Sequence, residues 1–227
     1  ADVKFFVDKI RADSFPDIYD FTADGHKVLN KLESSSKTTI ALTTGLSLGG
    51  GLELALSCDY RIGTRKTQFR FPETNIGIFP GLGGTQRPAR IAGLPAARWA
   101  VLAGNFMDAR TAADLGLVTD LVDVTEVDST IASLDAKGKP AEKYPAAPVN
   151  PESKIAKFAN SFYSDDNMDT LLNGGCPDGF DPEDKLVSRQ LKSLSRTAPI
   201  ALRMASDLID AAGKTELMTG LGQELDN

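Results

Sequence analysis

The sequence feature that most restricts the fold is a run of three glycines at residues 49–51. The residues before it, 38–44, are rich in β-branched side chains and predict a strand, whereas residues 52–56 predict a short helix. A strand that passes through a glycine turn into a helix is typical of α/β proteins. Because glycine has no Cβ and the first N–H groups of a helix point outward, the backbone here can approach a ligand closely. The turn therefore predicts either a site for a developing negative charge or tight packing of the helix on the strand.

The rest of the chain predicts an α/β core followed by a helical region. Apolar spacing predicts one helix over residues 3–10 and a second that reaches about Leu32. The further elements expected for the core are strands at 59–63, 68–71 and 121–124, a helix opened by residues 81–85, and helical structure over 94–117. The later helices are expected at residues 152–163, 183–194 and 199–212.

Prolines divide the chain. Three of them fall inside residues 137–151, before the one at the end of that segment, and predict a loop or linker. We therefore expect a core over residues 1–136, a linker over residues 137–151 and a helical C-terminal region over residues 152–227.

Composition argues against several functional classes. A net charge of −6 speaks against general affinity for nucleic acids, and no apolar run approaches the roughly 18 residues of a membrane span. Cys58 and Cys176 lie far apart and support neither a zinc site nor a disulfide framework, so we expect a reducing cytoplasm. The one histidine, His26, is expected at the exposed start of a helix and outside catalysis. Any catalysis must then rely on carboxylates and backbone amides.

Motif searches narrow the chemistry further. Neither glycine cluster fits a phosphate-binding loop or a dinucleotide-binding fingerprint, and no G-x-S-x-G nucleophile elbow is present. Two glutamates remain as candidates. Glu53 lies one turn into the glycine-started helix among apolar residues, and Glu73 follows Pro72, which fixes the chain before it. Each glutamate alone would usually be a solvated side chain, but two neighbouring carboxyl groups predict a coupled titration.

Ordered motifs across residues 1–124 resemble one known family. They are A-D-V-K from Ala1, L-G-G-G-L-E-L from Leu48 with Cys58-Asp59, F-P-E-T-N-I-G from Phe71, P-G-L-G-G-T-Q-R from Pro80, and the later L-A-G, A-A and G-L-V segments at residues 102–118. This series is similar to that of the enoyl-CoA hydratase superfamily, also called the crotonase superfamily. The resemblance implies a ββα spiral core with a C-terminal helical region, acyl-CoA substrates, no cofactor beyond the CoA of the substrate, no metal, and homotrimers that often pair into hexamers.

The resemblance also implies residue roles for the syn addition of water to a trans-2-enoyl-CoA thioester. Glu53 would hold and deprotonate the water, and Glu73 would deliver the proton to Cα. The backbone N–H groups of Ala1 and Gly50 would form an oxyanion hole. Other expected substrate contacts are Lys4, Gly49, Gly51, Pro72, Ile78, Pro80 and Gly81. Three cations, Lys4, Arg87 and Arg90, are either partners of the CoA phosphates or ordinary surface charges and salt-bridge partners.

Departures from the family keep alternatives open. The family's early strands would precede Ala1 and its final helix would extend past Asn227, so we expect this chain to be part of a longer polypeptide. Residues 11–36 are longer than in simple hydratases, and residues 137–184 have no familiar counterpart. Similar sequences occur fused to 3-hydroxyacyl-CoA dehydrogenases. The alternatives to hydration are Δ3–Δ2 enoyl-CoA isomerisation or another crotonase-type reaction, and a non-catalytic CoA-binding or scaffold subunit.

Overall fold

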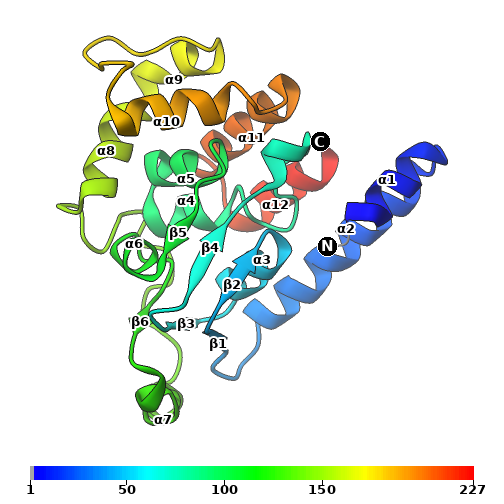
Figure 1. Ribbon diagram of the computed structural model, residues 1–227. Helices are drawn as coiled ribbons and strands as arrows, with labels where there is room; N and C mark the ends of the chain where they lie inside the picture. Colours follow the sequence, from blue (N-terminus) through cyan, green and yellow to red (C-terminus); the bar gives the residue numbers. More distant parts are fainter. Residues whose placement is uncertain (1–2) are drawn as a thin grey trace.

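A computed structural model describes residues 3–227 and shows an α/β body with helices around it (Figure 1). The chain opens with α1 (Val3–Arg11) and α2 (Phe15–Glu33), which lie along one side of the body. Helix α1 folds back on α2, because the rings of Phe5 and Phe6 pack against Phe21 with centroids 5.1 and 5.7 Å away. The expected helices at residues 3–10 and up to Leu32 are therefore confirmed.

Six short strands form two separate sheets. The first sheet has the order β1 (Ile40–Thr43), β3 (Tyr60–Gly63) and β6 (Asp120–Leu121), all parallel. The second has the order β2 (Leu46–Leu48), β4 (Gln68–Arg70) and β5 (Met107–Asp108), in which β4 is parallel to β2 and antiparallel to β5. Parallel neighbours need crossover connections, and α3 (Gly50–Ser57) supplies one between the two sheets.

Helix α3 is short and buried on most of its surface. Leu52 and Leu56 are fully buried. The sequence of α3 is almost entirely apolar, and such a helix is expected to be buried on all sides. The elements that follow the strands are η1 (Glu73–Ile76), α4 (Arg87–Ala92), α5 (Leu94–Val101), α6 (Ala109–Asp114), η2 (Val124–Glu126) and α7 (Val127–Lys137). Between η1 and α4, residues 77–86 form an irregular loop, called the site loop below.

The C-terminal part of the chain is helical, as expected. Its helices are α8 (Lys154–Phe162), α9 (Asp165–Leu172), α10 (Lys185–Leu194), α11 (Pro199–Ala212) and α12 (Leu217–Asp226). One hydrophobic core joins these helices to the α/β part, because Leu52, Phe71 and Trp99 belong to the same buried cluster as Phe162 and Ile209. Residues 138–153 contain neither helix nor strand. The division into core, linker and helical region stays a prediction.

Several element boundaries differ from the expectations. Residues 46–48, expected as part of the glycine turn, form strand β2 by pairing with β4. The helix expected to open at residues 81–85 begins at Arg87, since turns occupy the residues before it. The helical structure expected over residues 94–117 is present as α5 and α6, and β5 lies between them to complete the second sheet. The last strand ends at Leu121, and residues 124–126 form η2 instead.

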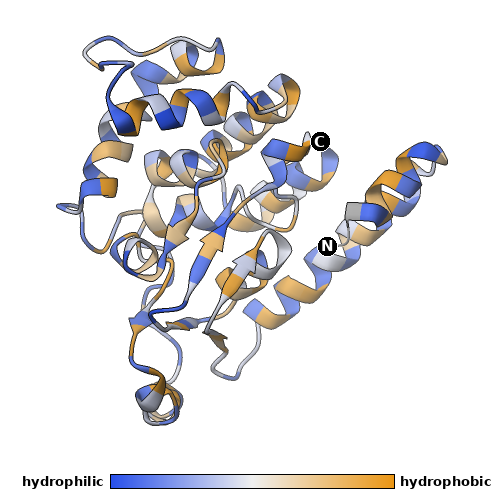
Figure 2. Cartoon of the chain, viewed as in Figure 1, coloured by the Kyte–Doolittle hydropathy of each residue, from blue (hydrophilic) through white to orange (hydrophobic). Residues whose placement is uncertain are grey.

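Exposed apolar side chains concentrate on α1 and α2. Both helices carry orange and blue along their length in Figure 2. Phe15, Tyr19 and Val28 of α2 are 56%, 49% and 63% exposed, so much of the apolar face of α2 is not covered by the described body. None of the helices within residues 3–227 has the length and apolar composition to cross a membrane.

Candidate active site

Glu53 is held against the site loop. It lies one turn into α3, and its side chain is 2% exposed, although carboxylates are seldom buried. Glu53 Oε1 accepts hydrogen bonds from the backbone N–H groups of Leu82 (2.7 Å) and Gly84 (2.8 Å). A Cβ atom on Gly84 would lie 2.8 Å from the same oxygen. The loop therefore approaches Glu53 as closely as a glycine backbone permits.

Glu73 meets the glycine turn from the other direction. It is the first residue of η1, and a Cβ atom on Gly49 would lie 2.1 Å from Glu73 Oε1. Gly49 has φ +47°, which L side chains rarely adopt, and its N–H donates to the carbonyl of Arg70 (3.0 Å). Glu73 Oε2 is buried and has no hydrogen-bond partner among residues 3–227. Glycine at position 49 thus provides the space that the Glu73 carboxyl occupies.

The pKa values of both carboxyl groups are raised. Burial raises the pKa of Glu53 to about 7, and the N–H groups of Leu82 and Gly84 limit that rise. Burial raises the pKa of Glu73 to about 8, and the nearby charge of Glu53 adds to it. Near neutral pH the pair can therefore hold one proton, and the protonated group is preferentially Glu73. Chemically, such a pair can accept a proton at Glu53 and donate one at Glu73.

The start of α3 borders this pair. Gly50 and Gly51 are its first residues, so their N–H groups have no acceptor within the helix. A Cβ atom on Gly51 would meet no atom within 4 Å. The Gly50 N–H thus has the setting expected of an oxyanion donor, whereas Ala1, the other expected donor, lies outside the described residues. The oxyanion hole stays a prediction.

Most of the other expected substrate contacts lie on η1 and the site loop. Pro72 precedes η1 directly, and the N–H of Ile78 donates to the carbonyl of Glu73 (3.2 Å). Pro80 packs closely on the loop, because a Cβ on Gly84 would lie 2.4 Å from Pro80 Cβ. A Cβ on Gly81 would touch α2 at 3.8 Å. The structure brings these residues together around the two glutamates, and their substrate contacts stay predictions.

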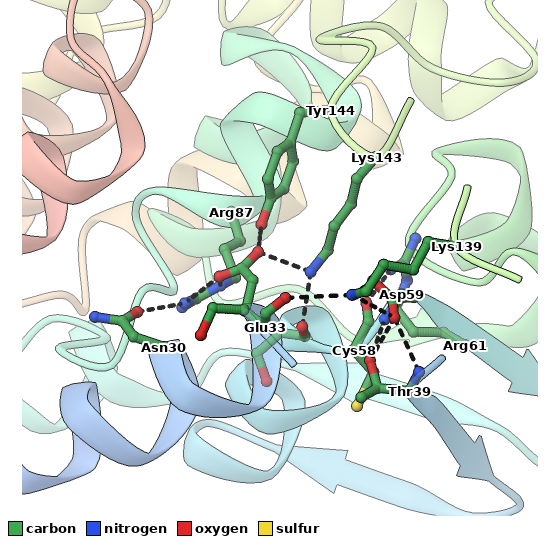
Figure 3. A network of polar contacts seen from close by, with 12 residues as sticks. Asn30, Glu33, Thr39, Cys58, Asp59, Arg61, Arg87, Lys139, Lys143 and Tyr144 are labelled. Carbon is green, nitrogen blue, oxygen red and sulfur yellow. Dashed lines mark hydrogen bonds and ion pairs between the residues drawn. The ribbon is translucent and has the colours of Figure 1, made fainter. Parts of the chain in front are cut away.

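Two of the three candidate phosphate partners instead stabilise the fold. Arg87 is fully buried and pairs with Glu33 (2.8 Å), and Figure 3 shows its guanidinium beside that carboxylate. Arg90 donates to two backbone carbonyl groups at and after the end of α11 (2.6 and 2.7 Å). The role as a partner of the CoA phosphates is wrong for both arginines, because their N–H donors already bond to acceptors of the protein itself. Lys4 is exposed on α1, and its phosphate role stays a prediction.

The expectation that His26 is a surface residue is wrong. His26 lies in the middle of α2 and is only 6% exposed, because this part of α2 packs on α12 and the site loop. Its Nε2 lies 3.8 Å from Glu224 Oε2. Burial, together with the charge of Arg87, lowers the pKa of His26, so the imidazole is neutral at physiological pH.

Glu224, which no sequence motif indicated, is a third carboxyl group at the site and, like Glu53, is buried. It lies on α12, is 2% exposed, and accepts from the backbone N–H of Gly83 (2.6 Å) and Thr85 (3.0 Å). The sequence contained one signal for it, since Leu217, Leu221 and Glu224 share one face of a helix. Residues 3–227 contain no cluster of side chains suited to a metal ion, and both cysteines are free.

Comparisons with known proteins indicate the family. A family model described as enoyl-CoA hydratase/isomerase matches residues 1–227. A short-chain-enoyl-CoA hydratase of Clostridium acetobutylicum is 39% identical over 113 residues, which cover 50% of this chain and 43% of that protein. A fatty acid oxidation complex subunit alpha of Shewanella frigidimarina is 40% identical over 139 residues, 60% of this chain and 19% of that protein.

Solved structures give the same fold. An enoyl-CoA hydratase from Rhodobacter sphaeroides superposes with a TM-score of 0.78 over 99% of this chain and 65% of that one, at 22% identity. At that identity the likeness establishes the fold, and the expected crotonase-like α/β architecture is confirmed. The chain spans about 43% of the length of the Clostridium relative and about two thirds of the Rhodobacter chain.

Proposed function

The chain belongs to the enoyl-CoA hydratase/isomerase family, and on that premise we propose that it hydrates a trans-2-enoyl-CoA thioester to a 3-hydroxyacyl-CoA. The observation that carries the proposal is a pair of carboxyl groups, the buried Glu53 and the half-buried Glu73, beside a glycine-started helix N-terminus. Hydration needs a base for the water and an acid for Cα at the same time. A pair that holds one proton near neutral pH provides both.

The pKa values of the two carboxyl groups support one as the base and the other as the acid. With a pKa of about 7, Glu53 is the carboxyl that ionises first and can take a proton from water. Its Oε1 accepts both loop N–H groups, and no hydrogen bond within residues 3–227 engages Oε2, which leaves that oxygen for the water. Glu73, with a pKa of about 8, keeps its proton longer and can give it to Cα from the unpartnered Oε2.

The backbone would stabilise the charge that develops on the thioester oxygen. Addition of hydroxide at Cβ turns the thioester into an enolate, whose oxygen gains negative charge. The Gly50 N–H lies at the positive end of the α3 dipole, where an oxyanion is favoured. One such donor is worth about 10²- to 10³-fold in rate, and a positioned acid or base about 10²- to 10⁴-fold.

Hydration of crotonyl-CoA, followed as loss of the conjugated thioester absorbance, tests the proposal. We expect turnover by the protein and a fall of about 10²- to 10⁴-fold in both Glu53→Gln and Glu73→Gln. Glu152→Gln, which changes an exposed glutamate of a surface ion pair, is the matched control and should hydrate normally. A Glu73→Gln protein that hydrates at the normal rate would contradict the assigned role of Glu73.

The pH dependence tests which carboxyl is the base. kcat/KM should fall below pH about 7, as Glu53 gains a proton, and above pH about 8, as Glu73 loses one. The resulting bell should lose its acidic limb in Glu53→Gln, whatever rate remains. An acidic limb that persists in that variant would reverse the assignment.

The family's other chemistry is the main alternative. Δ3–Δ2 isomerisation can proceed with one acid–base carboxyl, so the presence of both glutamates favours hydration. A 3-enoyl-CoA substrate separates the two reactions, because its conversion without hydration of crotonyl-CoA would indicate an isomerase. Failure to bind any acyl-CoA would instead indicate a scaffold subunit.

We also propose the assembly and context that family membership suggests. These are a homotrimer or hexamer, a cytoplasmic location and, in a longer polypeptide, a fused 3-hydroxyacyl-CoA dehydrogenase. The two free cysteines suit a reducing compartment. Sedimentation of the purified protein tests the oligomer, and a monomer at micromolar concentration would contradict it.

A further inference from the structure

The backbone N–H groups of residues 82–85 bond alternately to two buried carboxyls. The first and third donate to Glu53 Oε1, at 2.7 and 2.8 Å. The second and fourth donate to the two oxygens of Glu224, at 2.6 and 3.0 Å, and the Thr85 hydroxyl donates to Glu224 as well. Glu53 belongs to α3 and Glu224 to α12, so the site loop is held between two helices that are 171 residues apart in sequence (224 − 53).

We propose that Glu224 is a positioning residue, which holds the site loop so that the N–H groups of Leu82 and Gly84 stay directed at Glu53. This inference rests on the proposed hydratase function and assigns a role to a residue outside the glutamate pair. Because successive N–H groups of the loop point in opposite directions, fixing those of Gly83 and Thr85 also fixes the neighbouring N–H groups of Leu82 and Gly84. Glu224 acts on the reaction only through the loop and Glu53.

The position of Glu224 depends on the packing of α12. Gly220, one turn earlier, lies so close to Gln86 that a Cβ there would be 1.9 Å from Gln86 Oε1. Gln86 is fully buried and donates to the carbonyl of Leu208 on α11 (2.8 Å). Helix α12 also packs on α2, where His26 faces Glu224. The Glu224 carboxyl is therefore buried between α2 and the site loop.

The charged surroundings of Glu224 come from three elements. They are Glu53 on α3, His26 on α2, and Arg87 and Arg90 on α4. Burial raises the pKa of Glu224 to about 8, with the charge of Glu53 adding to the rise. Glu224 is therefore largely uncharged at the pH where Glu53 titrates, and its loss should affect Glu53 through the loop rather than through its charge.

Loss of Glu224 has a distinctive consequence for Glu53. Without it, two buried N–H groups lose their acceptors and the loop must move to regain partners. Glu53 then loses the N–H groups of Leu82 and Gly84, which hold its pKa down. The acidic limb of the pH–rate profile should consequently shift to higher pH. A substitution that only lowered the folded fraction would reduce the rate at every pH and leave the limb in place.

Two variants and one control test the proposal with two measurements. Glu224→Leu removes both acceptor oxygens, and we expect kcat/KM at pH 7 to fall about 100-fold, as for a displacement of about 1 Å in an active site. Glu224→Gln keeps one acceptor oxygen and should fall less. Glu216→Gln changes an exposed glutamate at the start of the same helix and should match the unsubstituted protein. Amide hydrogen exchange of the peptide that contains residues 82–85 is measured in parallel.

The outcomes separate this proposal from the proposed function. Faster exchange at residues 82–85 together with an upward shift of the acidic limb in both Glu224 variants would support it. Unchanged exchange, or faster exchange without a shift of the limb, would overturn it, since Glu224 would then be irrelevant or merely structural. If the unsubstituted protein does not hydrate crotonyl-CoA, the function fails. Exchange at residues 82–85 then still decides whether Glu224 holds the loop.

Discussion

At the scale of single residues, Gly49 restricts the site most closely. A methyl group at this position would lie 2.1 Å from Glu73 Oε1, and φ +47° is unfavourable for any L side chain. Gly49→Ala should therefore displace the Glu73 carboxyl and strain the backbone by about 1–3 kcal/mol. We expect about a 100-fold loss of crotonyl-CoA hydration, because displacement of a reacting group by about 1 Å costs that much.

The control for this substitution is Gly45, the glycine directly before strand β2. A Cβ on Gly45 would meet no atom within 4 Å, and its φ lies outside the left-handed region. Gly45→Ala should hydrate crotonyl-CoA at the normal rate. Equal losses in Gly45→Ala and Gly49→Ala would mean that glycine in the backbone on either side of β2, rather than contact with Glu73, sets activity.

Residue roles were predictable from the sequence only where a motif carried them. Glu53 and Glu73 were found from the glycine turn and the family resemblance, and the charge of Glu53 acts on Glu73 in the structure. His26 was misjudged, because a polar side chain on an amphipathic helix is usually exposed, and its burial depends on partners far away in the sequence. Glu224 was missed for the same reason, since its acceptor role appears only when α12 meets the site loop.

At the scale of elements, the close approach of α12 depends on Gly220. A Cβ there would lie 1.9 Å from Gln86 Oε1, which belongs to a fully buried side chain. Gly220→Ala should cost about 1–3 kcal/mol of overpacking, more than the 0.5–1 kcal/mol that alanine adds within a helix. We expect a lower urea midpoint and slower hydration, because α12 carries Glu224.

The same helix contains a matched control. A Cβ on Gly222 would meet no atom within 4 Å. Gly222→Ala should therefore stabilise the protein by roughly 0.5–1 kcal/mol through helix propensity alone. If both alanine variants stabilise the protein equally, Gly220 is not a packing constraint.

Elements with strong local signals were the ones predicted. The strand before the glycine turn and helices α3, α10 and α11 have clear periodicity or composition, and their boundaries agree to within a few residues. Strands β2 and β5 are three and two residues long and exist through pairing with β4. Local sequence patterns could not predict this strand pairing, because it joins residues about 20 to 40 positions apart.

At the scale of the whole molecule, Glu33 joins three distant parts of the chain. At the end of α2 it accepts from Arg87 on α4, Lys143 (2.7 Å) and the hydroxyl of Tyr144, as Figure 3 shows. Burial opposes its ionisation, but the charges of Arg87 and Lys143 outweigh this and hold the pKa of Glu33 below its ordinary value. Residues 138–153 are thus tied to the core by buried charges, which the proline pattern could not indicate.

Removing the Glu33 charge should destabilise the molecule. Glu33→Gln leaves two buried cations without a counter-charge, which costs about 3–5 kcal/mol for buried pairs. The urea midpoint should fall accordingly. Asp24→Asn, in a pair with Lys27 whose side chains are both more than 70% exposed, should change it little. Similar effects of the two substitutions would contradict the importance of burial for this network.

The three carboxyl groups at the site also set how stability depends on pH. Glu53, Glu73 and Glu224 have an ordinary pKa of 4.5, and in the folded protein their pKa values are about 7, 8 and 8. Between these limits the folded state binds more protons than the unfolded state, so their contribution to the free energy of unfolding falls as pH rises. That contribution is fully present below pH about 4.5 and is lost as pH rises through 7 to 8.

Glu73→Gln isolates one of these groups, because glutamine never ionises. Near pH 4 the Glu73 carboxyl is protonated in the folded protein and largely so in the unfolded protein, so variant and unsubstituted protein should unfold at similar temperatures. At pH 8.5 only the unsubstituted protein must ionise a buried, unpartnered carboxyl, so the variant should unfold at a higher temperature. The expected gain is roughly 2–4 °C for each kcal/mol that this ionisation costs in a protein of this size. The exposed control Glu152→Gln should change the unfolding temperature by the same amount at both pH values. If Glu73→Gln behaves in the same way, Glu73 does not titrate as the reaction requires. A gain confined to high pH would mean that the acid needed for protonation of Cα is held at the expense of stability.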